Sequence, residues 1–216
     1  MNLSSEFWDL VALYEANLIK FNQIHNLTNY KSIKSVAIDS VEMLENLAKF
    51  IQSNTPNLIK SNQSNLNNFN TVNQLNLSQI PLFDKIKICI DVGSGAGFPA
   101  IFLSFVLKDC EFHLFEPIMK KASFLSFVKI NLGLKNIIIH PQKIQNSPKF
   151  KANLITSRAV MKADDLIQIC SGFYDESSIF ALYKGQNAKD EIANINATKQ
   201  ISHAKNRNYV FLKDIK

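Results

Sequence analysis

The sequence predicts an α/β domain with a largely parallel sheet, preceded by a helical segment. From Lys85 onward, short apolar runs alternate with helical stretches, which is the pattern of strand–helix–strand units. The first expected strand leads directly into a glycine-rich turn at 93–97. Residues 4–50 instead carry apolar side chains at helical spacing, which indicates two or three amphipathic helices.

Each element of the α/β region follows from its residue pattern. The expected strands are IKICIDV (86–92), EFHLFE (111–116), NIIIH (136–140), ANLITSR (152–158) and SSIFALYKG (177–185). The expected helices between them are PAIFLSFVL, KKASFLSFVKINLG and ADDLIQICSGF. Two last segments, QISHAK and NYVFLKD, are separated by a short polar turn and predict a closing β-hairpin.

Composition divides the chain into three regions: a helical segment at 1–50, an asparagine-rich insertion or connector at 51–80, and the α/β domain at 81–216. Asparagine and serine are frequent between residues 51 and 80, and the hydrophobic periodicity weakens there, as in solvated connectors. We assign this middle segment no function.

Composition also excludes several classes of protein. Acidic residues interrupt the apolar positions near the start of the chain, so we expect no secretory signal. No apolar run approaches the roughly 20 residues of a membrane span. The three cysteines are widely spaced without a C-x-x-C pair, which argues against disulfides and a zinc site. The four histidines are scattered, so we expect neither a metal site nor a histidine base. The cysteine pattern suits the reducing cytoplasm, and we expect a monomer.

The formal net charge of +6 suits a polyanionic partner such as RNA, although lysine-rich surfaces also serve solubility. Charge therefore suggests a partner without identifying one.

Gly93, Gly95 and Gly97 lie in the turn that follows the first strand of the sheet. This places them at the carboxyl end of a parallel sheet, where doubly wound folds bind ligands. Glycine accepts positive φ and lets a ligand approach the backbone. A tight turn without any ligand is the alternative explanation.

The spacing around these glycines favours S-adenosylmethionine over a dinucleotide. In Gly-x-Gly-x-x-Gly, the third glycine falls where this chain has Phe98, and Pro99 has no N–H to offer a phosphate. Asp91 precedes the turn and suits a ligand ammonium or a structural water network. Glu116 ends the next strand and can accept hydrogen bonds from two ribose hydroxyls.

At this point the sequence resembles the RsmG family, also called glucose-inhibited division protein B, which methylates N7 of one guanine in 16S ribosomal RNA. The motifs that carry the resemblance are DVGSGAGFPA, FEPIMKKASFL, ITSRAV and LYKGQ, together with KFNQIHNLTNYKSI and DSVEML upstream. The resemblance implies a class I (Rossmann-like) S-adenosylmethionine-dependent methyltransferase. Its sheet is expected to be mostly parallel and seven-stranded, with an antiparallel last strand and an N-terminal helical segment.

The resemblance also implies roles for individual cofactor-binding residues. Gly93 and its neighbours would line the methionine part of the cofactor, Phe98 would form a wall of the pocket, and Glu116 would hold the ribose. Ile144 and Gln145 would contact the adenine. The sequence departs from the family here, because Lys143 stands for the usual arginine and Gln145 for the usual glutamate.

Arg158 and Lys184 are the candidate catalytic residues. Lys184, after the fifth strand, is a second candidate contact at the same rim of the sheet, or else a solvated loop charge. Arg158 ends the fourth strand, which in this class of fold faces the transferable methyl group. Guanine N7 carries a free lone pair and no proton, so positioning rather than a base would carry the reaction. Arg158 could hold the O6/N7 edge of guanine, a phosphate or the methionine carboxylate. It could instead only pair with Asp164 or Asp165.

Two other classes of function stay open. A methyltransferase of a small molecule or a protein would keep the glycine turn and Glu116 without needing a basic rim. A non-catalytic RNA-binding protein with a degenerate cofactor pocket would explain Lys143 and Gln145. The leading hypothesis is methyl transfer to 16S ribosomal RNA or the small ribosomal subunit, with no metal and no membrane partner.

Overall fold

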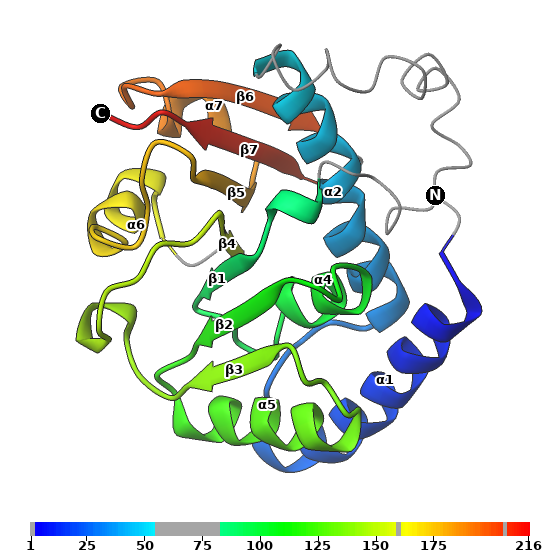
Figure 1. Ribbon diagram of the computed structural model, residues 1–216. Coiled ribbons are helices and arrows are strands. Elements are labelled where there is room, and N and C mark those ends of the chain that lie inside the picture. Colours follow the sequence, from blue (N-terminus) through cyan, green and yellow to red (C-terminus); the bar gives the residue numbers. More distant parts are fainter. Residues whose placement is uncertain (1–2, 55–82, 159–160, 205–206) are drawn as a thin grey trace.

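The computed structural model describes residues 3–54, 83–158, 161–204 and 207–216 (Figure 1). Helices cover both faces of a seven-stranded sheet with the order β3-β2-β1-β4-β5-β7-β6. All neighbouring strands are parallel except β7, which runs antiparallel to both β5 and β6. The predicted fold class is therefore confirmed, including the closing hairpin and the antiparallel last strand.

The elements follow the expected order. The strands are β1 (Ile88–Val92), β2 (Glu111–Phe115), β3 (Ile137–His140), β4 (Leu154–Arg158), β5 (Ile179–Lys184), β6 (Thr198–His203) and β7 (Asn208–Lys213). The helices are α1 (Ser5–His25), α2 (Ile33–Asn54), α4 (Ala100–Val106), α5 (Met119–Asn131), α6 (Ala163–Ile169) and α7 (Ala188–Glu191), with 3-10 turns η4 (Phe83–Lys85) and η5 (Ile144–Asn146). Among these described helices, none combines the length and apolarity needed to cross a membrane.

The N-terminal helices have clear local signals. The Ser4 hydroxyl caps α1 by accepting a hydrogen bond from the Phe7 N–H at 3.2 Å, and Asn26 ends α1 in the left-handed region, with φ of 47°. Helix α2 continues to Asn54, beyond the boundary expected at residue 50. Most of the expected insertion at 51–80 lies outside the described residues.

The sheet is buried on both faces, which is typical of parallel sheets flanked by helices. Helices α1, α2, α4 and α5 pack with one face, whereas α6 and α7 contribute to the hydrophobic cluster on the other (Figure 1). Successive side chains of a strand point to opposite faces. In β1, for example, Cys89 belongs to the first cluster and Ile90 to the second.

The N-terminal helices share one hydrophobic core with the sheet and brace the glycine turn. Tyr14 of α1 is fully buried, and its hydroxyl donates a hydrogen bond to the Ala96 carbonyl at 2.5 Å. Its ring makes edge contacts with Phe98, Phe102 and Phe124. The helical segment is therefore part of the structure that positions the turn.

Removing the Tyr14 hydroxyl should weaken this brace. We expect Tyr14→Phe to lower the free energy of unfolding by about 1–3 kcal/mol, because the buried Ala96 carbonyl loses its donor. Tyr174→Phe is the control, since the Tyr174 hydroxyl has no hydrogen-bond partner among the residues described. Urea unfolding measures both variants. Equal stabilities of the two variants would contradict the role of the Tyr14–Ala96 bond.

Candidate functional site

The glycine turn between β1 and α4 has the backbone conformation that the sequence predicted. Gly93, Gly95 and Gly97 all have positive φ, at 71°, 60° and 99°, where other residues are strained. The turn is fixed by the N–H groups of Gly93 and Ser94, which both donate to the Phe115 carbonyl at the end of β2. The turn thus lies against the carboxyl ends of β1 and β2.

Two of these glycines have different surroundings. A Cβ on Gly97 would clash with Ile101 Cγ1 and lie 2.9 Å from Leu125 Cδ2, so Gly97 allows α4 and α5 to pack against the turn. A Cβ on Gly95 would meet only the Gly93 carbonyl, at 4.0 Å. The space beside Gly95 is therefore open to a ligand, whereas Gly97 serves packing.

Asp91 is a buried carboxyl group at the end of β1. Its Oδ1 atom accepts a hydrogen bond from the Thr156 hydroxyl at 2.7 Å, and its buried Oδ2 atom has no hydrogen-bond partner in the described structure. Burial raises the pKa of Asp91 to about 7. A partner that donates a hydrogen bond or a positive charge would satisfy Oδ2 and stabilise the ionised form.

Glu116 follows β2 and holds the glycine turn directly. One carboxylate oxygen accepts a hydrogen bond from the Gly95 N–H at 2.7 Å, and the other accepts from the Ile118 N–H at 2.9 Å. Each oxygen keeps a further lone pair for another donor. Glu116 thus has a structural role beside any role in binding a ligand.

In the segment after β3, the two residues expected at an adenine have different environments. Ile144 is buried in the cluster on the α6 side of the sheet, while Gln145 and Lys143 are exposed. The Ile144 side chain therefore belongs to the hydrophobic core, and only its backbone atoms remain for contact with a ligand. The Gln145 side chain has no hydrogen-bond partner within the described residues.

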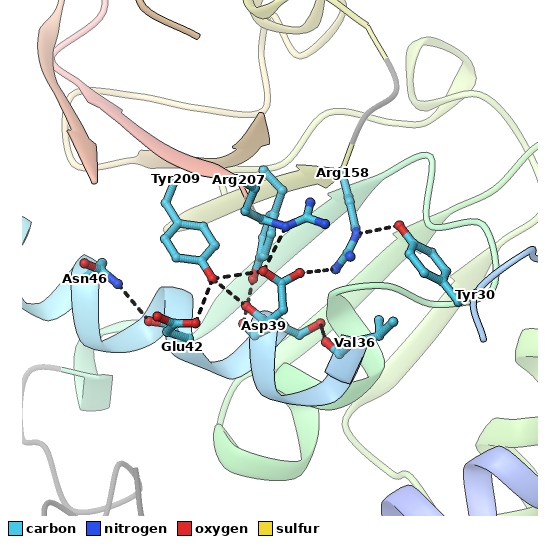
Figure 2. A network of polar contacts seen from close by, with 10 residues as sticks. Tyr30, Val36, Asp39, Glu42, Asn46, Arg158, Arg207 and Tyr209 are labelled. Carbon is cyan, nitrogen blue, oxygen red and sulfur yellow. Dashed lines mark hydrogen bonds and ion pairs between the residues drawn. The ribbon is translucent and has the colours of Figure 1, made fainter. Parts of the chain in front are cut away.

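Arg158 does not pair with Asp164 or Asp165; its ion-pair partner is Asp39 of α2. The Nη1 atom of Arg158 lies 2.8 Å from Asp39 Oδ2, and its Nε donates to the Tyr30 hydroxyl at 3.2 Å. Arg207 Nε approaches the other Asp39 oxygen at 2.8 Å. Figure 2 shows the carboxylate of Asp39 between the two guanidinium groups.

Aromatic rings and a second acid surround this cluster of Tyr30, Asp39, Arg158 and Arg207. The Arg158 guanidinium lies over the rings of Tyr30 and Tyr183, at 5.1 and 5.7 Å from their centres. The Tyr209 hydroxyl contacts Asp39 at 3.0 Å and Glu42 at 3.5 Å (Figure 2). Burial and the neighbouring acids Asp39 and Glu45 raise the pKa of Glu42.

An open cavity of about 460 Å³ lies beside this cluster. Its lining residues come from the segment before α2, from α2, from the end of β4 and from the β6–β7 hairpin: Tyr30, Ser32, Ser35, Val36, Ile38, Asp39, Glu42, Arg158, Ala204 and Arg207. Tyr30 also contacts Phe98 of the glycine turn, with ring centres 5.6 Å apart. The cavity and the glycine turn therefore meet at Tyr30.

Lys184 is not among the residues that line this cavity. Its Nζ donates to the Met161 carbonyl at 2.6 Å and pairs with Glu191 at 2.5 Å. Glu191 also accepts a hydrogen bond from the Ala163 N–H. In β5, Tyr183 points toward α2, so the next residue, Lys184, points to the opposite face. Lys184 thus fixes the start of α6.

Two histidines that are far apart in the sequence form a pair. His113 Nδ1 lies 2.9 Å from His140 Nε2 on the neighbouring strands β2 and β3, and His113 Nε2 contacts Glu111 at 2.8 Å. Within the described ranges, no group of three or more His, Cys, Asp or Glu side chains could hold a metal ion.

Three residues of the cluster were not predicted from the sequence as site residues. Asp39 lies in the DSVEML segment and Tyr30 in LTNYK, both noted only as family motifs. Arg207 precedes the last strand without any motif. The ion pairs depend on long-range packing of α2 and the β6–β7 hairpin, which one sequence does not reveal.

The fold and the placement of the glycine turn define the class of protein. The structure is similar to a solved S-adenosylmethionine-dependent methyltransferase from Aquifex aeolicus, with a TM-score of 0.50 and 14% sequence identity, covering 61% of this chain and 85% of that one. The seven-stranded sheet with its antiparallel β7 is the sheet of class I methyltransferases.

Sequence comparison then gives the family. The family model described as rRNA small subunit methyltransferase G matches residues 41–216. The chain is 48% identical over 216 residues to the "Ribosomal RNA small subunit methyltransferase G" of Campylobacter fetus, covering 100% of both chains. It is 41% identical over 212 residues to the protein of that name from Campylobacter curvus, covering 98% and 94%. The chain belongs to the rRNA small subunit methyltransferase G family, as the sequence motifs indicated.

The packing of Gly97 leads to a test of the glycine turn. Gly97→Ala should lower the free energy of unfolding by about 2–4 kcal/mol, because it adds steric overlap to the strain of positive φ. The control is Gly133→Ala, where φ is 65° and a Cβ would meet nothing within 4 Å. That control should cost only about 1–2 kcal/mol. If urea unfolding gave equal losses, the packing role of Gly97 would be wrong.

The raised pKa of Asp91 predicts a pH dependence of stability. A carboxyl whose pKa is higher in the folded state stabilises the fold while protonated, and this contribution is lost as pH rises toward about 7. Between pH 5 and the pKa of about 7 the loss should be about 3 kcal/mol, at 1.36 kcal/mol per pH unit, with little further loss up to pH 8. Asp91→Asn has no ionisable group at this position, so its stability should not show this loss with rising pH. Urea unfolding measures both proteins at pH 5 and pH 8. An equal change in the free energy of unfolding for wild type and Asp91→Asn would contradict this prediction.

Proposed function

We propose that this protein transfers a methyl group from S-adenosylmethionine to N7 of a guanine in 16S ribosomal RNA. The observation that carries the proposal is the 48% identity over the whole chain to a relative named for the ribosomal RNA small subunit. The glycine turn and the cavity meet at Tyr30, which contacts both Phe98 and Arg158, and this supports the proposal. The proposed enzyme acts as a cytoplasmic monomer, and its free cysteines suit a reducing compartment.

The residues around the glycine turn fit the proposed cofactor. The open space beside Gly95 admits a ligand against the backbone, and the buried Asp91 Oδ2 atom lacks a partner that an ammonium group would supply. Glu116 has lone pairs left for ribose hydroxyls. When bound, the cofactor supplies an electrophilic methyl group. In this proposal Asp91 binds the ammonium group of the cofactor and Glu116 binds its ribose hydroxyls.

Arg158 is the residue that we propose to orient the guanine. Its side chain is 5% exposed. In the described structure its Nη1 atom pairs with Asp39 and its Nε atom donates to Tyr30, which leaves Nη2 for a ligand. A guanidinium can donate to guanine O6, which leaves the N7 lone pair free to attack. Because N7 has no proton, this chain needs no general base there. Lys184 acts indirectly in the proposal, by fixing the start of α6 after Arg158.

The proposal is tested by methyl transfer from labelled cofactor to small ribosomal subunits from cells that lack this gene. The labelled nucleotide is mapped by reduction and cleavage at N7-methylguanine. Wild type should label one guanine, and Arg158→Ala should reduce the rate by about 100-fold or more, as for loss of a positioned charged donor. Lys162→Ala, at an exposed lysine nearby, is the control and should keep the rate.

Three results would contradict this function. Labelled protein or metabolites instead of RNA would indicate another substrate class. No cofactor binding by calorimetry would favour a non-catalytic RNA-binding protein. Cofactor binding with no transfer to the subunits would exclude the ribosomal assignment.

A further inference from the structure

The cavity beside α2 contains two arginine side chains that share one carboxylate. Arg158 and Arg207 each approach a different oxygen of Asp39 at 2.8 Å. Asp39 therefore balances one of the two positive charges. The other acid of the cavity, Glu42, contacts Tyr209, and within the described ranges it forms no ion pair with either arginine.

The atoms of this shared ion pair are poorly satisfied. Arg158 Nη1, Arg207 Nε and Asp39 Oδ2 are all buried, and in the described structure none of them makes a hydrogen bond of good geometry. Buried polar atoms without good hydrogen bonds are costly. These atoms face one another in the ion pairs, so an additional anion would bind the guanidinium nitrogens that are not directed at Asp39.

Arg207 is the arginine better placed to meet an incoming ligand. Its side chain is 18% exposed, against 5% for Arg158. Only its Nε atom is directed at Asp39, and Figure 2 shows its terminal nitrogens pointing away from that carboxylate. Those terminal nitrogens have no protein partner in the part of the chain described. A guanidinium fork of this kind binds phosphate through two parallel N–H groups.

On this basis, and resting on the proposed function, we propose that Arg207 binds a phosphate of the acceptor nucleotide while Arg158 meets the base. The cavity volume of about 460 Å³ is within the range of small-ligand sites. Tyr30, which is 45% exposed, offers an aromatic face on which a base can stack. Asp39 acts as a positioning residue that holds both arginines toward the cavity.

The test is the salt dependence of methyl transfer to small ribosomal subunits by wild type, Arg207→Gln and Lys108→Gln. Lys108 is an exposed lysine that pairs with Glu6, and its substitution removes the same charge away from the cavity. Arg207→Gln should raise KM about tenfold with kcat within about twofold, because a phosphate contact is lost. The slope of log KM against log salt should fall by about 0.7–0.9. Lys108→Gln should change neither quantity.

Two results overturn the role of Arg207. Equal KM values and equal salt slopes for Arg207→Gln and Lys108→Gln would show that Arg207 contacts no phosphate. A fall in kcat with methylation of further guanines would show that Arg207 reads the base. If circular dichroism shows that Arg207→Gln does not fold, the salt series is measured with Arg207→Lys instead, because this variant keeps the charge. It should keep the salt slope near wild type while KM rises a few-fold, because lysine keeps the charge but loses the two parallel N–H groups. A salt slope that falls by about 0.7–0.9 in Arg207→Lys would contradict the proposal.

Failure of the proposed function is recognised separately. If wild type binds cofactor but methylates no RNA, the reaction is wrong. In that case the same salt series, measured as filter binding of the subunits, still tests Arg207. A smaller salt slope for Arg207→Gln than for Lys108→Gln then supports the phosphate contact, and equal slopes overturn it.

Discussion

The arrangement of the site depends on the ion pairs of Asp39. This carboxylate on α2 contacts Arg158 from the end of β4 and Arg207 from just before β7, so it joins three parts of the chain that are far apart in sequence. Buried ion pairs often add little net stability, yet leaving one partner unpaired is costly. The interaction therefore fixes where α2 sits on the sheet more than it stabilises the fold, and the shape of the cavity follows from that position.

The alternation of side chains along the strands determines which residues can join this cluster. Tyr183 and Arg158 are register partners on β5 and β4, and both point toward α2. Lys184 is one position further along β5 and must point to the face covered by α6 and α7. The sequence placed Arg158 and Lys184 at the same rim, which is correct along the strands. The two side chains are nevertheless separated by the sheet, because a strand has a period of two residues.

The accuracy of the sequence-based predictions varied with the range of the interactions involved. The strands, the glycine turn and the closing hairpin are set by local patterns, and all were predicted. The family motifs also identified the family correctly. The sequence could not show that Gly97 is required for helix packing, since the contact with Leu125 comes from another helix. Nor could it pair Asp39 with two arginines, because that contact requires the folded sheet and the docked α2.

The chemistry of a proton-free acceptor explains why such a cavity can work without a base. Both oxygens of Asp39 face guanidinium groups at 2.8 Å, so neither is directed at an incoming nucleophile to accept its proton. A substrate whose nucleophile carries a proton would need a free base at this place. Guanine N7 carries none, so charged groups that position the base and its phosphate are sufficient. The same pairing with Asp39 holds the two arginines where an anionic nucleotide can reach them.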